Sequence, residues 1–204
     1  MEEIRYQLFE DGSLVNQVTI KKIKPCVASE GRIRVLMQVD AELGDIIPLM
    51  VSKYPPGNVN YVERKNVLTL TIFRRLITIY PSGKISMNKN RDKEEAVQVI
   101  KNIMKDINQC YNDLKRGNST NYQDLKDKIS KIGPLSIYNC LPQTNCEECG
   151  EATCMAFAMK LLSGDSQLIE CIPLNGNSYS ENVKCLEELL GSQLMETMGW
   201  KTNN

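Results

Sequence analysis

The sequence predicts an α+β protein, in which an antiparallel sheet with two packed helices is followed by a small, mostly helical segment rich in cysteine. Three observations predict this arrangement. Apolar and polar residues alternate along several short runs of the first half, with the two-residue period of half-buried strands. One long run before residue 116 repeats apolar residues every three or four positions. Four closely spaced cysteines follow in the second half.

The strands are expected in the first half. In 32–40 every second residue from Ile33 to Val39 is apolar, so these side chains share one face of a strand. Pro81-Ser82-Gly83 interrupts the last apolar run and predicts a hairpin there. We expect the strands to pair antiparallel, and to cover residues 14–23, 32–40, 67–73 and 76–87.

Two helices are expected to pack on this sheet. Residues 45–54 suit about three turns, with Asp45 as the N-cap, Pro48 in the first turn and Pro55-Pro56-Gly57 as the stop. The longer helix begins at Asp92-Lys93-Glu94-Glu95, which resembles a capping box. Its apolar face consists of Ala96, Val97, Ile100, Ile103, Met104 and Ile107.

Charge divides the chain into two parts. Basic and acidic side chains number 25 each, but about 19 basic and 14 acidic residues lie before residue 117, and about 6 and 11 follow it. Charged, glycine and small polar residues at 115–121 end the long helical pattern. We therefore expect an α+β docking or interaction domain at 1–116 and a helical, cysteine-bearing domain at 117–204.

The basic runs of the first half are interpreted as solvated faces or turns. They are Lys21-Lys22-x-Lys24 and Arg74-Arg75. Docking of an acidic partner is the alternative interpretation of the same residues.

Composition excludes several classes of protein. With 42% apolar and 25% charged residues the chain is typical of a folded domain, and no apolar run reaches the roughly 18–20 residues that span a bilayer. No basic, apolar leader is recognisable, so we expect a cytoplasmic protein in a reducing compartment. Histidine is absent, which excludes His-based catalysis and His-ligated metals. Eight cysteines then indicate metal binding more than disulfides.

The spacing Cys-x2-Cys-x4-Cys-x16-Cys-x-Pro indicates an iron–sulfur site. Four thiolates are what a 4Fe–4S cluster requires, because each iron keeps one terminal ligand after bridging to three sulfides. Gly150 is expected to let the backbone approach the cluster where a side chain would intrude. A helix over 152–162 would place free amides and a positive dipole beside an anionic group. The candidate ligands are Cys146, Cys149, Cys154 and Cys171.

A structural zinc site is the alternative for these four residues, although zinc usually takes two Cys-x2-Cys pairs. The other cysteines have no short mutual spacing. They are interpreted as small buried hydrophobic residues, and they are Cys26, Cys110, Cys140 and Cys185.

The segment from Asn145 to Ala158, with Cys171 downstream, resembles a known four-cysteine iron–sulfur domain. That domain stands at the head of the large subunit of the corrinoid iron–sulfur protein, the gamma subunit of acetyl-CoA decarbonylase/synthase. It occurs in variant form in the B subunit of Rnf electron-transport complexes. The resemblance covers roughly residues 134–175. It implies a 4Fe–4S cluster that passes electrons at low potential, with Cys146, Cys149, Cys154 and Cys171 as its ligands.

A second resemblance concerns the first half. The hairpin at 77–87, followed by Asp92 and the long helix, resembles one repeat of the TATA-binding-protein fold over residues 32–110. This resemblance implies a fold and not a function.

Three functions are open at this point. The first is a 4Fe–4S protein for electron transfer, or a redox accessory protein without catalysis of its own, in an anaerobic corrinoid or one-carbon pathway. It would work with redox partner proteins and without a membrane. The alternative is a redox-sensing regulator whose first domain binds nucleic acid or a transcription factor. An enzyme with an open iron is the third, and four cysteine ligands argue against it.

Overall fold

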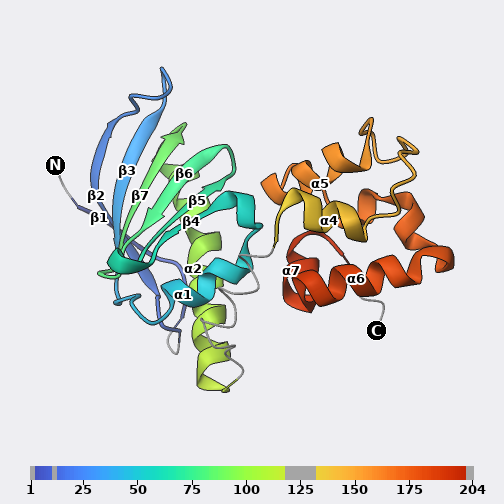
Figure 1. Ribbon diagram of the computed structural model, residues 1–204. Helices are drawn as coiled ribbons and strands as arrows, with labels where there is room; N and C mark the ends of the chain where they lie inside the picture. The colour runs from blue at the N-terminus through green and yellow to red at the C-terminus, as the bar shows by residue number, and fades with distance from the viewer. Residues whose placement is uncertain (1–2, 11–12, 118–131, 201–204) are drawn as a thin grey trace. The chain divides into compact units, whose positions relative to one another are not determined.

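The computed structural model describes residues 3–10, 13–117 and 132–200 (Figure 1). The described residues form two compact units, and each has its own core. The first unit holds the described residues of 1–51 and 59–119, and the second holds 52–58 with those of 120–204. The short segment Ser52–Asn58 therefore packs with the second unit although its neighbours in sequence belong to the first. The predicted α+β class is confirmed.

The first unit contains one antiparallel sheet of seven strands. Its order across the sheet is β1-β2-β3-β7-β6-β5-β4, so β7 joins two meanders by pairing with β3. The predicted strands and their antiparallel pairing are confirmed, whereas the two edge strands of four residues each, β1 and β4, were not predicted. In chain order the strands are β1 (Ile4–Gln7), β2 (Gln17–Pro25), β3 (Ile33–Val39), β4 (Val59–Val62), β5 (Val67–Ile72), β6 (Arg75–Ile79) and β7 (Lys84–Asn90).

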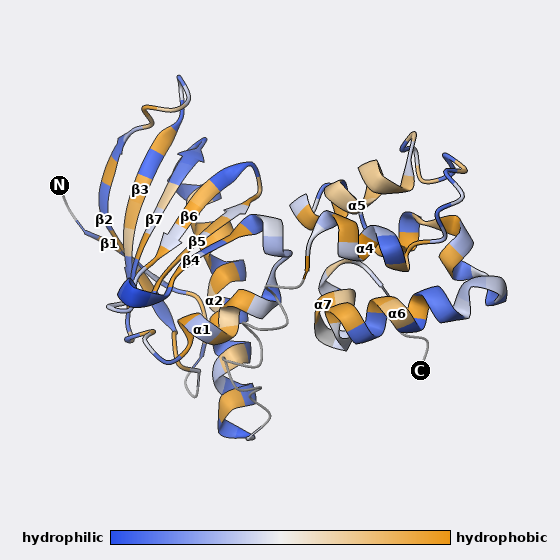
Figure 2. Cartoon of the chain, viewed as in Figure 1, coloured by the Kyte–Doolittle hydropathy of each residue, from blue (hydrophilic) through white to orange (hydrophobic). Residues whose placement is uncertain are grey.

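One face of this sheet forms the core of the first unit. Figure 2 shows hydrophilic and hydrophobic residues alternating along the strands. In β3 the side chains of Val35, Met37 and Val39 are buried, as the alternation predicts, and Arg34 on the other face is exposed. Burial of one face and exposure of the other is the ordinary condition of an antiparallel sheet with helices on one side.

The long helix is α2 (Lys93–Lys115), and its six predicted apolar residues are all buried. Asp92 caps it by accepting a hydrogen bond from the Glu95 amide at 2.7 Å. Glu95 reaches back to the amide of Arg91 (2.6 Å). Asn108, on the buried face, exchanges two hydrogen bonds of 2.9 Å with the backbone of Val15, which fixes the helix to the chain ahead of β2.

The other predicted helix is shorter than expected. Within the predicted range 45–54 the structure has the helix α1 (Ile47–Met50) and the 3-10 turn η1 (Val51–Lys53). A separate 3-10 turn, η2 (Pro56–Asn58), follows Pro55. The prediction that Asp45 caps it was wrong. The amides of Ile46 and Ile47 both bond to the carbonyl of Leu43 (3.0 Å each), so the backbone itself closes this end of the helix.

The second unit is helical. Its apolar core includes Phe157, Leu161 and Leu186, which are at most 1% exposed. The helices of the second unit are α4 (Pro134–Cys140), α5 (Cys154–Ser163), α6 (Ser180–Leu190) and α7 (Ser192–Thr197), with 3-10 turns η4 (Leu168–Glu170), η5 (Ile172–Asn175) and η6 (Asn177–Tyr179). A further 3-10 turn, η3 (Glu63–Lys65), lies in the first unit.

None of the helices among the described residues has the length and apolar composition of a bilayer-spanning segment.

A disulfide joins two of these helices. Cys140, at the end of α4, is bonded to Cys185 in α6, with 5.4 Å between their Cα atoms. Cys140 is buried in the apolar core, as expected, and Cys185 is partly buried against it, but their pairing was not predicted. Helix packing brings together these two residues, which are 45 positions apart in sequence. Cys110 is buried, as expected, and is not part of a disulfide. The interpretation as a buried residue was wrong for Cys26, which is partly exposed.

Candidate metal centre

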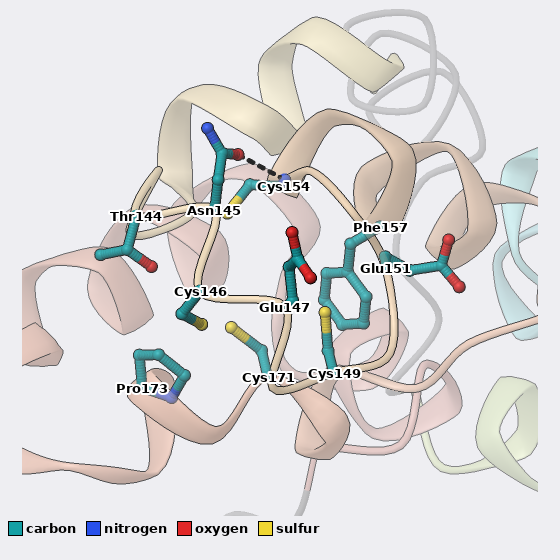
Figure 3. A pocket seen from close by; sticks show the side chains of 10 residues that line it. All are labelled: Thr144, Asn145, Cys146, Glu147, Cys149, Glu151, Cys154, Phe157, Cys171 and Pro173. Atoms are coloured by element: carbon teal, nitrogen blue, oxygen red, sulfur yellow. Dashed lines mark hydrogen bonds between the residues drawn. The ribbon is translucent and has the colours of Figure 1, made fainter.

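All four candidate ligands line one pocket of the second unit (Figure 3). Cys146 and Cys149 lie on the loop between α4 and α5, Cys154 is the first residue of α5, and Cys171 lies between η4 and η5. Three separate pieces of chain thus bring these thiols together. The rest of the lining consists of Thr144, Asn145, Glu147, Glu151, Phe157 and Pro173.

The loop that carries the first two cysteines has an unusual backbone. Gln143, Asn145 and Glu147 have φ values of 57°, 47° and 61°, and Gly150 has 84°. Left-handed φ at every second residue is the kind of backbone in which successive amides point to one side, as they do around anions and iron–sulfur groups. Non-glycine residues adopt it at a cost of about 1 kcal/mol or more each, a strain typical of functional loops.

Gly150 serves this loop by its conformation. Its amide bonds to the carbonyl of Glu147 (2.9 Å), which closes a tight turn between Cys146 and the rest of the motif. A Cβ atom at Gly150 would meet no protein atom within 4 Å, so the expectation that glycine leaves room for a bound cluster stays a prediction. The left-handed φ is the reason for glycine here.

The start of α5 is held by two side chains. The hydroxyl of Thr153 caps the helix by accepting from the Ala156 amide (3.1 Å), and the side-chain oxygen of Asn145 accepts from the Cys154 amide (2.8 Å). The amides expected to be free at this end are therefore partly engaged. The hydrogen bond from the Cys154 amide to Asn145 holds the loop that carries Cys146 against the start of α5. Sequence reasoning missed this positioning role, although an asparagine beside a ligand and able to adopt positive φ is a usable signal.

The surroundings of the pocket are acidic. Glu147 is exposed, whereas Glu151 is 16% exposed and forms an ion pair with Lys160 that raises the pKa of this lysine. Glu147 and Glu151 are the acidic residues that line the pocket, and the described residues 132–200 as a whole include nine carboxylates and two lysines. Negative charge around a redox group disfavours an added electron and so lowers its reduction potential.

Cys171 is protonated at neutral pH in the metal-free protein. Burial raises its pKa to about 11, and the neighbouring thiols of Cys149, Cys154 and Cys146 act in the same direction. Metals bind thiolates, so a metal or cluster entering this pocket must displace the proton of Cys171.

The donor set fits an iron–sulfur cluster. Four thiols in one pocket would match the one terminal ligand that each iron of a 4Fe–4S cluster requires, and Phe157 adds an apolar wall. Among the described residues, no group of three His, Cys, Asp or Glu side chains is arranged to hold a single metal ion.

Comparison with known proteins gives the same class of site. Residues 141–173 match the family model described as "Putative Fe-S cluster". This span includes all four cysteines that line the pocket. The second unit thus carries an iron–sulfur domain.

The curated relatives are gamma subunits of the acetyl-CoA decarbonylase/synthase complex. Gamma subunit 2 of Methanosarcina thermophila is 47% identical over 64 residues, which are 31% of this chain and 14% of the relative. The subunit of Methanocaldococcus jannaschii is 41% identical over 66 residues (32% and 14%), and that of Archaeoglobus fulgidus 46% over 59 residues (28% and 13%). The chain thus spans about a seventh of the length of these relatives. No solved structure matches, so the likeness of the first unit to a TATA-binding-protein repeat stays a prediction.

Proposed function

We propose that this chain binds a 4Fe–4S cluster through Cys146, Cys149, Cys154 and Cys171 and acts as a low-potential electron carrier or redox accessory protein. The observation that carries the proposal is the gathering of these four thiols in one pocket, within the segment matched by the iron–sulfur family model. The relatives, which are subunits of a complex for acetyl-CoA chemistry, favour protein partners, the cytoplasm and an anaerobic one-carbon pathway.

Each residue of the pocket has a part in this proposal. The cluster, when bound, supplies reversible one-electron chemistry. Asn145 and Thr153 hold the loop and the helix so that thiols from both face one space. Phe157 limits water on one side, and the nearby carboxylates keep the potential low. With one cysteine for each iron, the site has no open position for a substrate, which favours electron transfer over catalysis.

The ligand assignment is tested by Cys149→Ala, with Cys26→Ala as the matched control. Cys26 is a free cysteine of the first unit, outside the pocket. In protein purified without oxygen, Cys149→Ala should lose the brown absorption and most of its iron, whereas Cys26→Ala should retain both.

Circular dichroism shows whether each variant keeps its fold. The first unit has its own core, so its sheet should be unchanged in Cys149→Ala. Unchanged iron and absorption in folded Cys149→Ala would remove this residue from the site and refute the assignment.

A further inference from the structure

The charged side chains in the strands of the first unit are all basic. None of the seven strands contains an aspartate or a glutamate, and together they contain eight lysines and arginines. A sheet surface that evolves only for solubility carries charges of both signs. The strands therefore have a charge bias that the core of the unit does not require.

The strand register places four of these eight cations together on one face. Residues paired across antiparallel strands point to the same side of a sheet. Lys24 pairs with Arg34, and a bulge after Ile20 brings Lys22 opposite Leu36. On the next strand, β7, Leu36 pairs with Ser86 and Gln38 pairs with Lys84, so these residues lie on the same face. This is the face opposite the buried side chains of Val35 and Met37, and it is turned away from the core.

The centre of this face is hollowed. A depression of about 370 Å³ is lined by one set of residues, which we call the basic sheet face: Lys22, Lys24, Arg34, Leu36, Tyr80, Lys84 and Ser86. All four cations of the set are exposed. Figure 2 shows hydrophilic and hydrophobic residues along these strands.

The cations of the basic sheet face lack the carboxylate partners found elsewhere in the unit. Lys21, displaced by the bulge, pairs with Glu3 at 2.7 Å, and Arg75 on the buried side pairs with Glu95 at 3.2 Å. Within the described part of the chain, Lys22, Lys24, Arg34 and Lys84 form no ion pair, and the ammonium group of Lys84 lies 5.4 Å from the centre of the Tyr80 ring. Unpaired cations close together repel one another, and an anionic partner would relieve that repulsion.

The chemistry of the face favours carboxylates of a protein over nucleic acid. Sheets that bind single-stranded nucleic acid present several aromatic side chains on which bases stack. The basic sheet face has one, Tyr80, and the ammonium group of Lys84 lies over it. Its other members are Lys22, Lys24, Arg34, Leu36 and Ser86, none of which is aromatic. Exposed lysines and an arginine in a shallow depression suit a cluster of aspartates and glutamates on a folded surface.

We propose that the basic sheet face is the docking surface for the acidic surface of a partner protein. The second unit strengthens the argument, because its described residues 132–200 carry nine carboxylates and two lysines and would repel such a partner. An acidic protein that approaches this chain therefore needs attraction from elsewhere, and the basic sheet face supplies it. The inference does not depend on cluster binding, so it is tested separately.

The test measures binding of a fluorescently labelled, glutamate-rich peptide to the full chain by anisotropy at low and at high salt. The variant Lys22→Gln/Lys24→Gln/Arg34→Gln removes three cations of the face. Lys65→Gln/Lys101→Gln/Lys105→Gln removes three exposed cations outside it and serves as the matched control. Thermal unfolding of both variants checks that each is folded.

The wild-type chain should bind the peptide with an affinity that falls as salt increases. The variant of the basic sheet face should bind about tenfold more weakly and the control within about twofold of wild type. The Cys149→Ala protein, even without metal, should bind as wild type does, which separates this proposal from that of the cluster.

Three results would overturn the proposal. One is an equal loss of affinity in both triple variants. Another is tighter binding of an oligothymidylate of the same formal charge than of the peptide, with binding of the oligothymidylate lost in the variant of the basic sheet face. That result would assign the face to nucleic acid. The last is sedimentation showing self-association at low salt that the basic-sheet-face variant abolishes, which would assign it to a second copy of the chain.

Discussion

At the scale of single residues, the buried thiol of Cys171 makes the metal-free protein sensitive to alkaline pH. A thiol whose pKa is raised by folding stabilises the folded state while it is protonated in both states, and this contribution disappears as pH rises through the folded pKa. For Cys171 the loss falls between the ordinary value of 9.0 and about 11. The melting temperature of metal-free protein should therefore decline over this range more in wild type than in Cys171→Ala. Identical declines would show that this thiol is not perturbed.

Arg75 and Arg74 are adjacent arginines with different expected effects on stability. The guanidinium of Arg75 is buried, donates to Asn90 (2.9 Å) and pairs with Glu95 (3.2 Å), so the interpretation of both arginines as solvated was wrong for Arg75. Arg75→Gln should lower the free energy of unfolding by about 2–4 kcal/mol, because it leaves buried polar groups unpaired. Arg74→Gln, at an exposed turn, should change it by less than about 0.5 kcal/mol. Urea unfolding measures both, and equal effects would contradict the buried network.

At the scale of secondary-structure elements, the disulfide between α4 and α6 stabilises the frame that carries the cysteine loop. It closes a loop of 45 residues, and cross-links of this kind contribute about 2–4 kcal/mol. Unreduced, unfolded protein without metal should show six reactive thiols rather than eight. Cys185→Ala should lower the melting temperature of the second unit, and a reductant should abolish the difference from wild type. Eight reactive thiols without reductant would contradict the disulfide.

The elements differ in how far their own sequence specifies them. α2 was predicted with its cap and buried face because Asp92 and the apolar spacing act within a few residues of each other. The sequence of α1 suggested an N-cap at Asp45, but backbone bonds to Leu43 close the helix end instead. β1 and β4 are short edge strands, whose pairing depends on neighbours more than on their own residues.

In the candidate site, too, some features follow from residues close in sequence and others depend on contacts between distant residues. Its four cysteines could be selected from spacing, since that spacing reflects local loop and helix geometry. The pairing of Cys140 with Cys185 could not, because it joins residues that only the packed chain brings together. The bond from the Cys154 amide to Asn145 was missed, although Asn145 stands beside a candidate ligand. Burial of Arg75 likewise depends on Glu95, twenty positions away.

At the scale of the whole molecule, the two units have opposite electrostatic character. The basic sheet face belongs to the first unit, and the acidic residues around the cysteines belong to the second. The acidic residues of the second unit would lower the reduction potential of a bound cluster, and the basic sheet face of the first unit would attract an acidic partner. A chain with zero formal net charge can in this way serve both requirements.

Cluster binding is tested most directly by the metal content and paramagnetism of this chain purified without oxygen. We expect about four iron atoms and about four acid-labile sulfides per chain, with an electron paramagnetic resonance signal of a reduced 4Fe–4S cluster after chemical reduction. Cys149→Ala should lack both. Protein that contains zinc, no sulfide and no signal on reduction would contradict the claim.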